Sequence, residues 1–279
     1  MSSGDRSGWA SQYGPWAVVA GGSEGVGGEF AQLLATAGIN LVLIARTPAP
    51  LRHTADRCRA LGVQVQELAM DLARPDAAAH VAAATSEREV GLLIYNAGAN
   101  THIAEFLDGD LAAFDRVLDL NVRTPLGLVH HFGSPMRLRR RGGLLLVGSL
   151  AGYLGSARQS VYGGAKAFSR IYAEGLWLEL RAANVHVLEL VLGVTRTPAM
   201  RRAGLNFDIP GMRVSDPADV AREGLEALPH GPVHVITAHA GNPALRATSD
   251  RSAAVLAAHR TMQLLLNSTP HESDAPPAG

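Results

Sequence analysis

The sequence has a single cysteine, no long hydrophobic run and no excess of charge of either sign. The lone Cys58 excludes an internal disulfide and fits a reducing compartment. No stretch approaches the roughly 20 apolar residues that cross a membrane, and the polar residues 1–13 lack the apolar core of a signal peptide. The 25 basic and 25 acidic residues cancel, so charge favours neither nucleic acid nor an anionic membrane as a partner. We therefore expect a cytoplasmic protein with no nucleic-acid and no membrane partner.

Apolar residues make up 47% of the sequence and gather in short runs separated by helical patterns. Residues 144–147 are typical of a buried parallel strand, because every one is apolar and glycine follows. Similar runs occupy residues 16–20, 40–45, 63–69, 90–95, 185–192 and 233–237. The alternation predicts an α/β fold: a doubly wound, mostly parallel sheet of Rossmann topology, about seven strands, with helices on both faces. We expect a flexible segment over residues 1–13, one catalytic domain over 14–266 and a disordered tail over 267–279.

A glycine-rich turn follows the first predicted strand and precedes a helical pattern over residues 29–37. Its sequence is Gly21-Gly-Ser23-Glu-Gly25-Val26-Gly27. Small residues let the backbone approach a pyrophosphate, and the following helix offers free N–H groups. The alternative is a tight turn that holds no ligand.

The second predicted strand ends at Ala45-Arg46, without a carboxylate that could bind the adenosine ribose. An arginine at this place suits a 2′-phosphate, which favours NADP over NAD, although an ordinary surface arginine is the alternative. Glu24 in the glycine turn is a poor neighbour for such a phosphate. After the third strand, Asp71 is placed to bind the adenine amino group or to cap the next helix, and its chemistry favours the cap.

The fourth predicted strand is followed by Asn96, Ala97 and Gly98, which are small enough for a flat ring to lie against the backbone. A helical pattern then covers residues 111–136, with Asn121 in its middle. Asparagine is neutral to unfavourable inside a helix. We expect Asn121 either to bend the helix and hold a water or to be a satisfied polar residue at a helix contact.

Ser149 follows the strand over residues 144–147, at the sheet edge where open α/β folds bind their ligands. Tyr162 and Lys166 lie four residues apart in the next helical pattern and so share one face. The ammonium should favour the phenolate and lower the Tyr162 pKa from about 10. Such a tyrosine can exchange a proton with an alcohol or ketone. Taken alone, the pair would be read as an ordinary surface pair.

Together these motifs resemble the short-chain dehydrogenase/reductase family over about residues 16–235. The turn from Ala20 to Gly27 and the run from Tyr95 to Gly98 resemble the family's cofactor motifs, with Ala20 and Tyr95 as departures. The resemblance implies a catalytic tetrad of Asn121, Ser149, Tyr162 and Lys166. It implies a cofactor site of Gly21, Ser23, Gly25, Val26, Gly27, Arg46, Asp71, Leu72, Asn96, Ala97, Gly98, Tyr162, Lys166, Gly193 and Thr197.

The resemblance also implies where a substrate binds: in the loops after the fourth, fifth and sixth strands, with His102, Tyr153, Met200 and Phe207 as lining residues. The apolar character of these loops predicts a medium-sized apolar ketone or secondary alcohol. We expect an NADP(H)-dependent oxidoreductase with no metal, forming a homotetramer or homodimer. The alternative is a catalytically silent NADP-sensing binding protein on the same fold.

Overall fold

The computed structural model describes residues 3–202, 204–242, 245 and 260. Its centre is one parallel sheet in the order β3-β2-β1-β4-β5-β6-β7. The strands are β1 Trp16–Ala20, β2 Asn40–Ala45, β3 Val65–Ala69, β4 Val90–Tyr95, β5 Gly142–Ser149, β6 Val185–Leu192 and β7 Val233–Val235. The order reverses between β1 and β4, so the chain is doubly wound around this point. The predicted fold class is confirmed.

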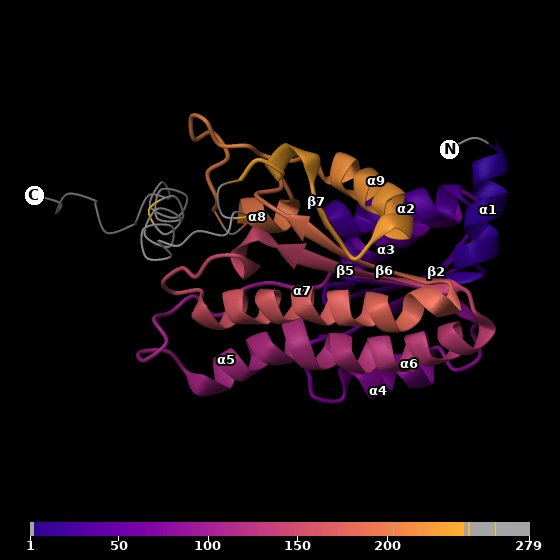
Figure 1. The fold of residues 1–279 in the computed structure, drawn as a ribbon, viewed down its shortest axis with the longest axis horizontal. Coiled ribbons are helices and arrows are strands. Elements are labelled where there is room, and N and C mark those ends of the chain that lie inside the picture. Colours follow the sequence, from indigo (N-terminus) through magenta and orange to yellow (C-terminus); the bar gives the residue numbers. More distant parts are fainter. Residues whose placement is uncertain (1–2, 203, 243–244, 246–259, 261–279) are drawn as a thin grey trace, which may run out of the picture.

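Helices cover both faces of the sheet (Figure 1). The principal helices are α1 Ser3–Tyr13, α2 Gly25–Thr36, α3 Pro48–Arg59, α4 Ala77–Ala84, α5 Leu111–Leu118, α6 Thr124–Arg139, α7 Ser160–Leu180, α8 Pro198–Arg202 and α9 Pro217–Ala227. Helices α2, α3 and α9 bury one apolar cluster against the sheet, including Phe30, Leu34 and Leu51. Helices α4, α6 and α7 bury a second cluster on the opposite face, including Leu128 and Phe132. Among the described residues, no helix is long and apolar enough to cross a membrane.

The first helix corrects our expectation of a flexible N-terminal segment. Residues Ser3–Tyr13 form α1, and Tyr13 is buried with its hydroxyl 2.6 Å from His186 Nδ1 on β6. Gln12 also donates to the Asn184 carbonyl oxygen at 3.0 Å. The polar composition hid this helix because its contacts with the sheet come from its last residues. The expected boundary at 266 and the tail over 267–279 lie outside the described part of the chain.

The helical pattern over residues 111–136 is interrupted in the structure. Helix α5 ends at Leu118, a π-helical turn covers Asp119–Arg123, and α6 begins at Thr124. The Tyr95 hydroxyl donates to the Leu120 carbonyl oxygen at 2.6 Å. Widened turns of this kind often mark functional positions in helices, and this one contains Asn121.

Candidate active and cofactor site

The glycine turn packs tightly between the end of β1 and the start of α2. A Cβ on Gly27 would lie 1.9 Å from the Gly21 carbonyl oxygen, so only glycine fits there. Gly25 has a φ of 55°, in the left-handed region that glycine adopts without strain. The Ser23 carbonyl oxygen accepts a hydrogen bond of 2.7 Å from Thr54 on α3. This compact turn presents the N-terminus of α2 at the carboxyl edge of the sheet, as a phosphate site requires.

The predicted residues after β4 and β6 meet the same turn. Asn96 Nδ2 donates to the Gly21 carbonyl oxygen at 2.9 Å, and the Ala97 N–H donates to Ala20 at 2.8 Å. The Thr197 side chain lies 3.1 Å from the position of a Cβ on Gly25. The structure therefore brings these predicted cofactor residues together around the start of α2.

The structure also shows how the more buried predicted cofactor residues could take part. Val26 and Leu72 have buried side chains, so only their backbone atoms can reach a ligand. Leu72 already accepts a hydrogen bond of 2.8 Å from Thr124 at its carbonyl oxygen. Gly193 lies against the buried ring of His239, and a Cβ on Gly193 would lie 2.5 Å from the Nδ1 atom of that ring.

Ser149, Tyr162, Lys166 and Asn121 come from three separate elements and converge at this edge of the sheet. Ser149 is the last residue of β5, and its hydroxyl hydrogen-bonds with that of Tyr162 on α7. Lys166 Nζ donates to the Val147 carbonyl oxygen at 2.9 Å. A Cβ on Gly98 would lie 2.7 Å from Lys166 Nζ and 2.9 Å from Asn121 Oδ1. Lys166 and Asn121 therefore lie beside Gly98, and Lys166 also lies 5.7 Å from the ring of Tyr162, the partner of Ser149.

Asn121 is oriented by its amide group. Its Nδ2 donates to the carbonyl oxygens of Val117 at 2.9 Å and Ala99 at 3.1 Å. Its Oδ1 is buried and has no hydrogen-bond partner among the described residues. An asparagine fixed in this way offers an acceptor to a group arriving between it and Lys166. The alternative that Asn121 is a fully hydrogen-bonded residue at a helix contact holds only for its amide nitrogen.

The Tyr162 pKa is raised, whereas we expected Lys166 to lower it. Burial raises the pKa of Tyr162, while the hydrogen bond with Ser149 opposes the rise. The Lys166 ammonium lies 5.7 Å from the Tyr162 ring centroid and is directed to the Val147 carbonyl oxygen. Burial also lowers the Lys166 pKa to about 8, against the opposing charge of Glu189. Desolvation therefore outweighs the attraction between phenolate and ammonium that we predicted.

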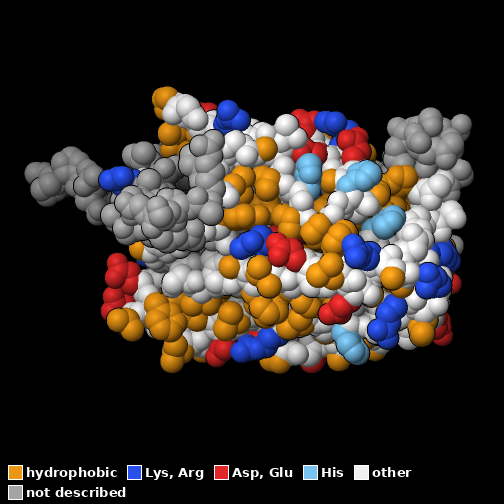
Figure 2. Space-filling view, viewed as in Figure 1, with side chains coloured by type: hydrophobic (Ala, Val, Ile, Leu, Met, Phe, Trp, Pro, Cys, Tyr) orange, Lys and Arg blue, Asp and Glu red, His pale blue; other side chains and the backbone are white. Residues whose placement is uncertain are grey.

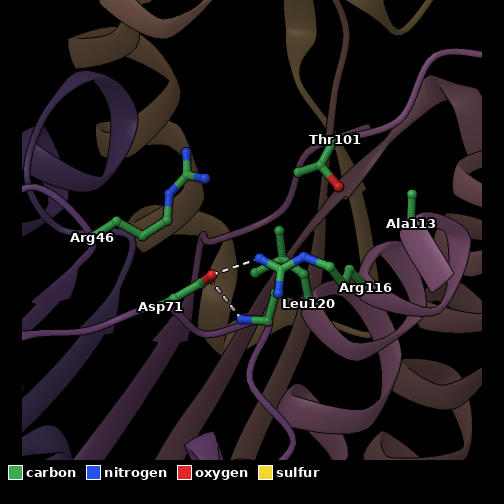
Figure 3. A pocket seen from close by; sticks show the side chains of 7 residues that line it. Arg46, Asp71, Thr101, Ala113, Arg116 and Leu120 are labelled. Atoms are coloured by element: carbon green, nitrogen blue, oxygen red, sulfur yellow. Dashed lines mark hydrogen bonds and ion pairs between the residues drawn. The ribbon is translucent and has the colours of Figure 1, made fainter.

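A pocket of about 260 Å³ lies between the ends of β2 and β3 and helix α5 (Figure 3). Arg46, Asp71 and Arg116 contribute its charged side chains. Asp71 accepts from the Ala73 N–H at 2.9 Å and pairs with Arg116 Nη2 at 2.8 Å. Burial raises the Asp71 pKa, but these two hydrogen bonds, aided by the charges of Arg116 and Arg46, bring it below its usual range. The predicted helix cap is wrong, since α4 begins after Asp76.

The residues predicted to line a substrate site lie on loops that leave the carboxyl ends of β4, β5 and β6. His102 Nε2 accepts from the Asp110 N–H at 3.2 Å. Tyr153 packs under the Arg170 guanidinium at 4.7 Å, and Phe207 under Arg196 at 5.0 Å. Met200 is 43% exposed on α8. Each of these contacts lies outside the tetrad, and a hydrogen bond of 3.3 Å from Asn100 to the Arg158 carbonyl oxygen joins the loops after β4 and β5.

Three features of the candidate site escaped the sequence interpretation. Arg202 on α8 forms a two-pronged ion pair with Glu24, so the charge that we judged unfavourable for a phosphate is already paired. Lys166 is the only lysine among all 279 residues. Glu189 is a buried carboxylate on β6. The last two signals were visible in the sequence, one as a unique residue and one as a charge within an apolar run. No group of residues able to hold a metal occurs in the described structure.

Comparison with known proteins places these features in a family. The family model for short chain dehydrogenases matches residues 15–206. A 7beta-hydroxysteroid dehydrogenase from Clostridium sardiniense is 29% identical, across 78% of this chain and 83% of that enzyme. A very-long-chain 3-oxoacyl-CoA reductase from Laccaria bicolor is 32% identical, across 70% of this chain and 60% of that enzyme.

Solved structures agree with the sequence matches. One determined in a study of 7beta-hydroxysteroid dehydrogenase stereoselectivity superposes with a TM-score of 0.81 at 25% identity, covering 89% of this chain and 98% of the other. A short-chain dehydrogenase from Sphingobium yanoikuyae in complex with NADPH has a TM-score of 0.73 at 27% identity, covering 94% and 99% of the two chains.

Proposed function

The chain belongs to the short-chain dehydrogenase family and is an oxidoreductase acting on hydroxyl or keto groups; from this premise, we propose that it interconverts a ketone and a secondary alcohol on an apolar, medium-sized substrate with NADP(H). The proposal rests on Lys166, which lies near the hydrogen-bonded Ser149–Tyr162 pair and, together with Asn121, beside Gly98. The names of the relatives support the apolar character of the substrate, because a hydroxysteroid and a very-long-chain 3-oxoacyl group are both predominantly apolar.

The site suits a dinucleotide cofactor. Gly27 lets the glycine turn fold closely over the start of α2, and the missing Cβ of Gly98 leaves room beside Lys166 Nζ and the unpartnered Asn121 Oδ1. In this proposal the glycine turn holds the pyrophosphate, Arg46 faces the 2′-phosphate, and Lys166 binds the nicotinamide ribose. The nicotinamide ring supplies or accepts the hydride when bound.

Four side chains would act on the substrate oxygen and the proton. Ser149 donates a hydrogen bond to the substrate oxygen and keeps it beside the Tyr162 hydroxyl. Tyr162 then gives its proton to that oxygen during reduction, or takes it during oxidation. Lys166 supplies positive charge near the phenolate as it forms, and Asn121 Oδ1 accepts a hydrogen bond from a water that returns the proton. The raised pKa of Tyr162 keeps the phenol protonated before reduction.

The preference for NADP(H) over NAD(H) is also a proposal. Arg46 is exposed at the end of β2 and faces the pocket of Figure 3. No carboxylate ends β2 to hold the ribose hydroxyls, and Glu24 is paired with Arg202. Both features reduce repulsion of a 2′-phosphate.

We propose a homodimer or homotetramer formed through α5 and α7. Hydrophobic side chains gather on this face of the molecule (Figure 2), where Leu111, Phe168, Ile171 and Leu178 are exposed. Exposed apolar area of this kind commonly marks a protein interface.

The test is ketone reduction by NADPH, with steroid-type ketones and 3-oxoacyl thioesters as the panel. Tyr162→Phe should lower turnover by about 10²-fold or more, the size expected for a lost general acid, while NADPH binding persists. Tyr172→Phe is the matched control, because Tyr172 lies on the same helix and stacks on Phe168 away from the tetrad. A Tyr162→Phe enzyme that keeps wild-type turnover, or a wild-type protein that binds NADPH without reducing any ketone, would contradict the proposal and favour a nucleotide-sensing role.

A further inference from the structure

Glu189 is a buried carboxylate on a strand face that is otherwise apolar. Alternate residues of β6 point to the same face, and the neighbours of Glu189 on that face are Val187 and Val191. Glu189 is 1% exposed, and its Oε2 has no hydrogen-bond partner among the described residues. A buried and incompletely bonded carboxylate destabilises the fold. The sheet itself therefore gives no reason for a carboxylate at this position.

The Glu189 side chain leans toward the candidate active site. Glu189 pairs in register with Leu146 on β5. Its Oε1 nevertheless lies 2.5 Å from the position of a Cβ on Gly148, further along β5 toward Ser149. Lys166 Nζ donates to the carbonyl oxygen of Val147, the residue just before Gly148. The carboxylate and the ammonium thus contact adjacent residues of one strand.

Charged groups on α7 and a phenol on a neighbouring loop surround this carboxylate. Helix α7 packs over β6 and brings Lys166, Arg170 and Glu174 toward it, and Ser169 hydrogen-bonds to it. The loop after β5 adds Tyr153, whose ring packs under Arg170. Burial raises the Glu189 pKa to about 7, while Lys166 and Arg170 oppose the rise. Glu189 in turn opposes the desolvation that lowers the Lys166 pKa to about 8.

We propose that Glu189 is a positioning residue for Lys166, a buried carboxylate beneath α7 that keeps the Lys166 side chain protonated beside Tyr162. The inference rests on the proposed function only for the role of Lys166 in the reaction. Its physical content is that removing the Glu189 charge makes Lys166 lose its proton at a lower pH. At neutral pH the site would then lack part of the positive charge that stabilises the Tyr162 phenolate.

Because Lys166 is the only lysine, its protonation can be followed directly. Lysine labelled with carbon-13 at Cε gives a single side-chain resonance, which is titrated in the wild type, in Glu189→Gln and in Glu223→Gln. Glutamine keeps the shape of the side chain and removes only the charge. Glu223→Gln is the matched control, because Glu223 lies on α9, on the other face of the sheet, where it bonds to Thr237 and His234.

We expect the Lys166 pKa to fall by about one pH unit or more in Glu189→Gln, as for the loss of a neighbouring opposite charge, and to stay unchanged in Glu223→Gln. The wild-type resonance should also show a second inflection near pH 7 as Glu189 titrates, a measurement that needs no variant to fold. With a ketone substrate, the alkaline limb of kcat/KM should move to lower pH by the same amount in Glu189→Gln. A merely structural role would lower activity without moving that limb.

An unchanged Lys166 pKa in Glu189→Gln, or a wild-type resonance without the second inflection, would overturn the proposal. Neither NMR result depends on turnover. If no ketone is reduced but the Lys166 pKa moves as expected, the proposed function fails while the coupling of Glu189 to Lys166 stands.

Discussion

The burial of Lys166 predicts a stability effect that can be measured without cofactor or substrate. The side chain is 7% exposed, and burial lowers its pKa from 10.5 to about 8. We consider Lys166→Met, which keeps an unbranched side chain of similar length and removes the ammonium. The variant also loses the hydrogen bond to the Val147 carbonyl oxygen. The pH dependence of the stability difference is therefore more informative than its value at one pH.

The sign follows from the direction of the shift. A lysine whose folded pKa lies below its unfolded pKa destabilises the fold while it is charged. This cost is fully present below about pH 8 and has disappeared above 10.5. The interval of about 2.5 pH units, at about 1.4 kcal/mol each, gives on the order of 3 kcal/mol. The free energy of unfolding of the wild type, minus that of Lys166→Met, should rise by this amount between pH 8 and 10.5.

The assay is denaturant unfolding of both proteins at several pH values across this window. Subtracting the free energy of unfolding of the variant from that of the wild type at each pH removes the titration of every group that does not interact with Lys166. Arg222→Met is the control, because it removes an exposed cation from α9 that stays charged throughout the window. A difference that stays flat from pH 8 to 10.5 would refute the reasoning, since it would mean that Lys166 is hydrated in the folded protein.

Three further predictions concern the cofactor, the π-helical turn and assembly. In fluorescence titrations, Arg46→Ala should weaken NADPH binding by about tenfold or more, as for a lost hydrogen bond to a charged group. NADH binding should stay unchanged. Equal losses of affinity for NADPH and NADH would contradict the 2′-phosphate role of Arg46. Tyr95→Phe should lower the free energy of unfolding by about 1–3 kcal/mol, because the Leu120 carbonyl oxygen loses its 2.6 Å hydrogen-bond partner. Amide hydrogen exchange around Asn121 should also accelerate. A variant with wild-type stability would show that water replaces the hydroxyl group. Ile171→Asp, which places a charge at a 58% exposed position, should shift the sedimenting species to the monomer, and a wild-type that is already monomeric at micromolar concentration would exclude the interface.

The strands and the position of Ser149 could be predicted because each depends on a short local pattern. A short apolar run such as residues 185–192 is typical of a buried strand, and parallel strands place their carboxyl ends at the same edge of the sheet. The convergence of Ser149, Tyr162 and Lys166 follows from that geometry with little further information. The presence of four matching tetrad residues was therefore readable from spacing and resemblance.

The remaining features depend on contacts between distant residues. The π-helical turn around Asn121 is fixed by a hydrogen bond from Tyr95, which no helical periodicity reveals. Asp71 bonds with Arg116, 45 positions away, and it lies too far before α4, which begins after Asp76, to cap that helix. The Tyr162 pKa depends on burial, which is a property of the whole fold and outweighs the local pairing with Lys166.

The uniqueness of Lys166 also affects the reagents that can be used on this protein. Of its 25 basic residues only this one carries an ε-amine, and that amine lies where the proposed cofactor would cover it. Acylating reagents should therefore modify a single side chain slowly, and a bound dinucleotide should protect it. Mass spectrometry of the acylated protein then reports site occupancy without any known substrate. For the same reason, cross-linkers that join two ε-amines are unsuited to testing the α5–α7 interface, and carboxyl- or guanidinium-directed reagents are the better choice.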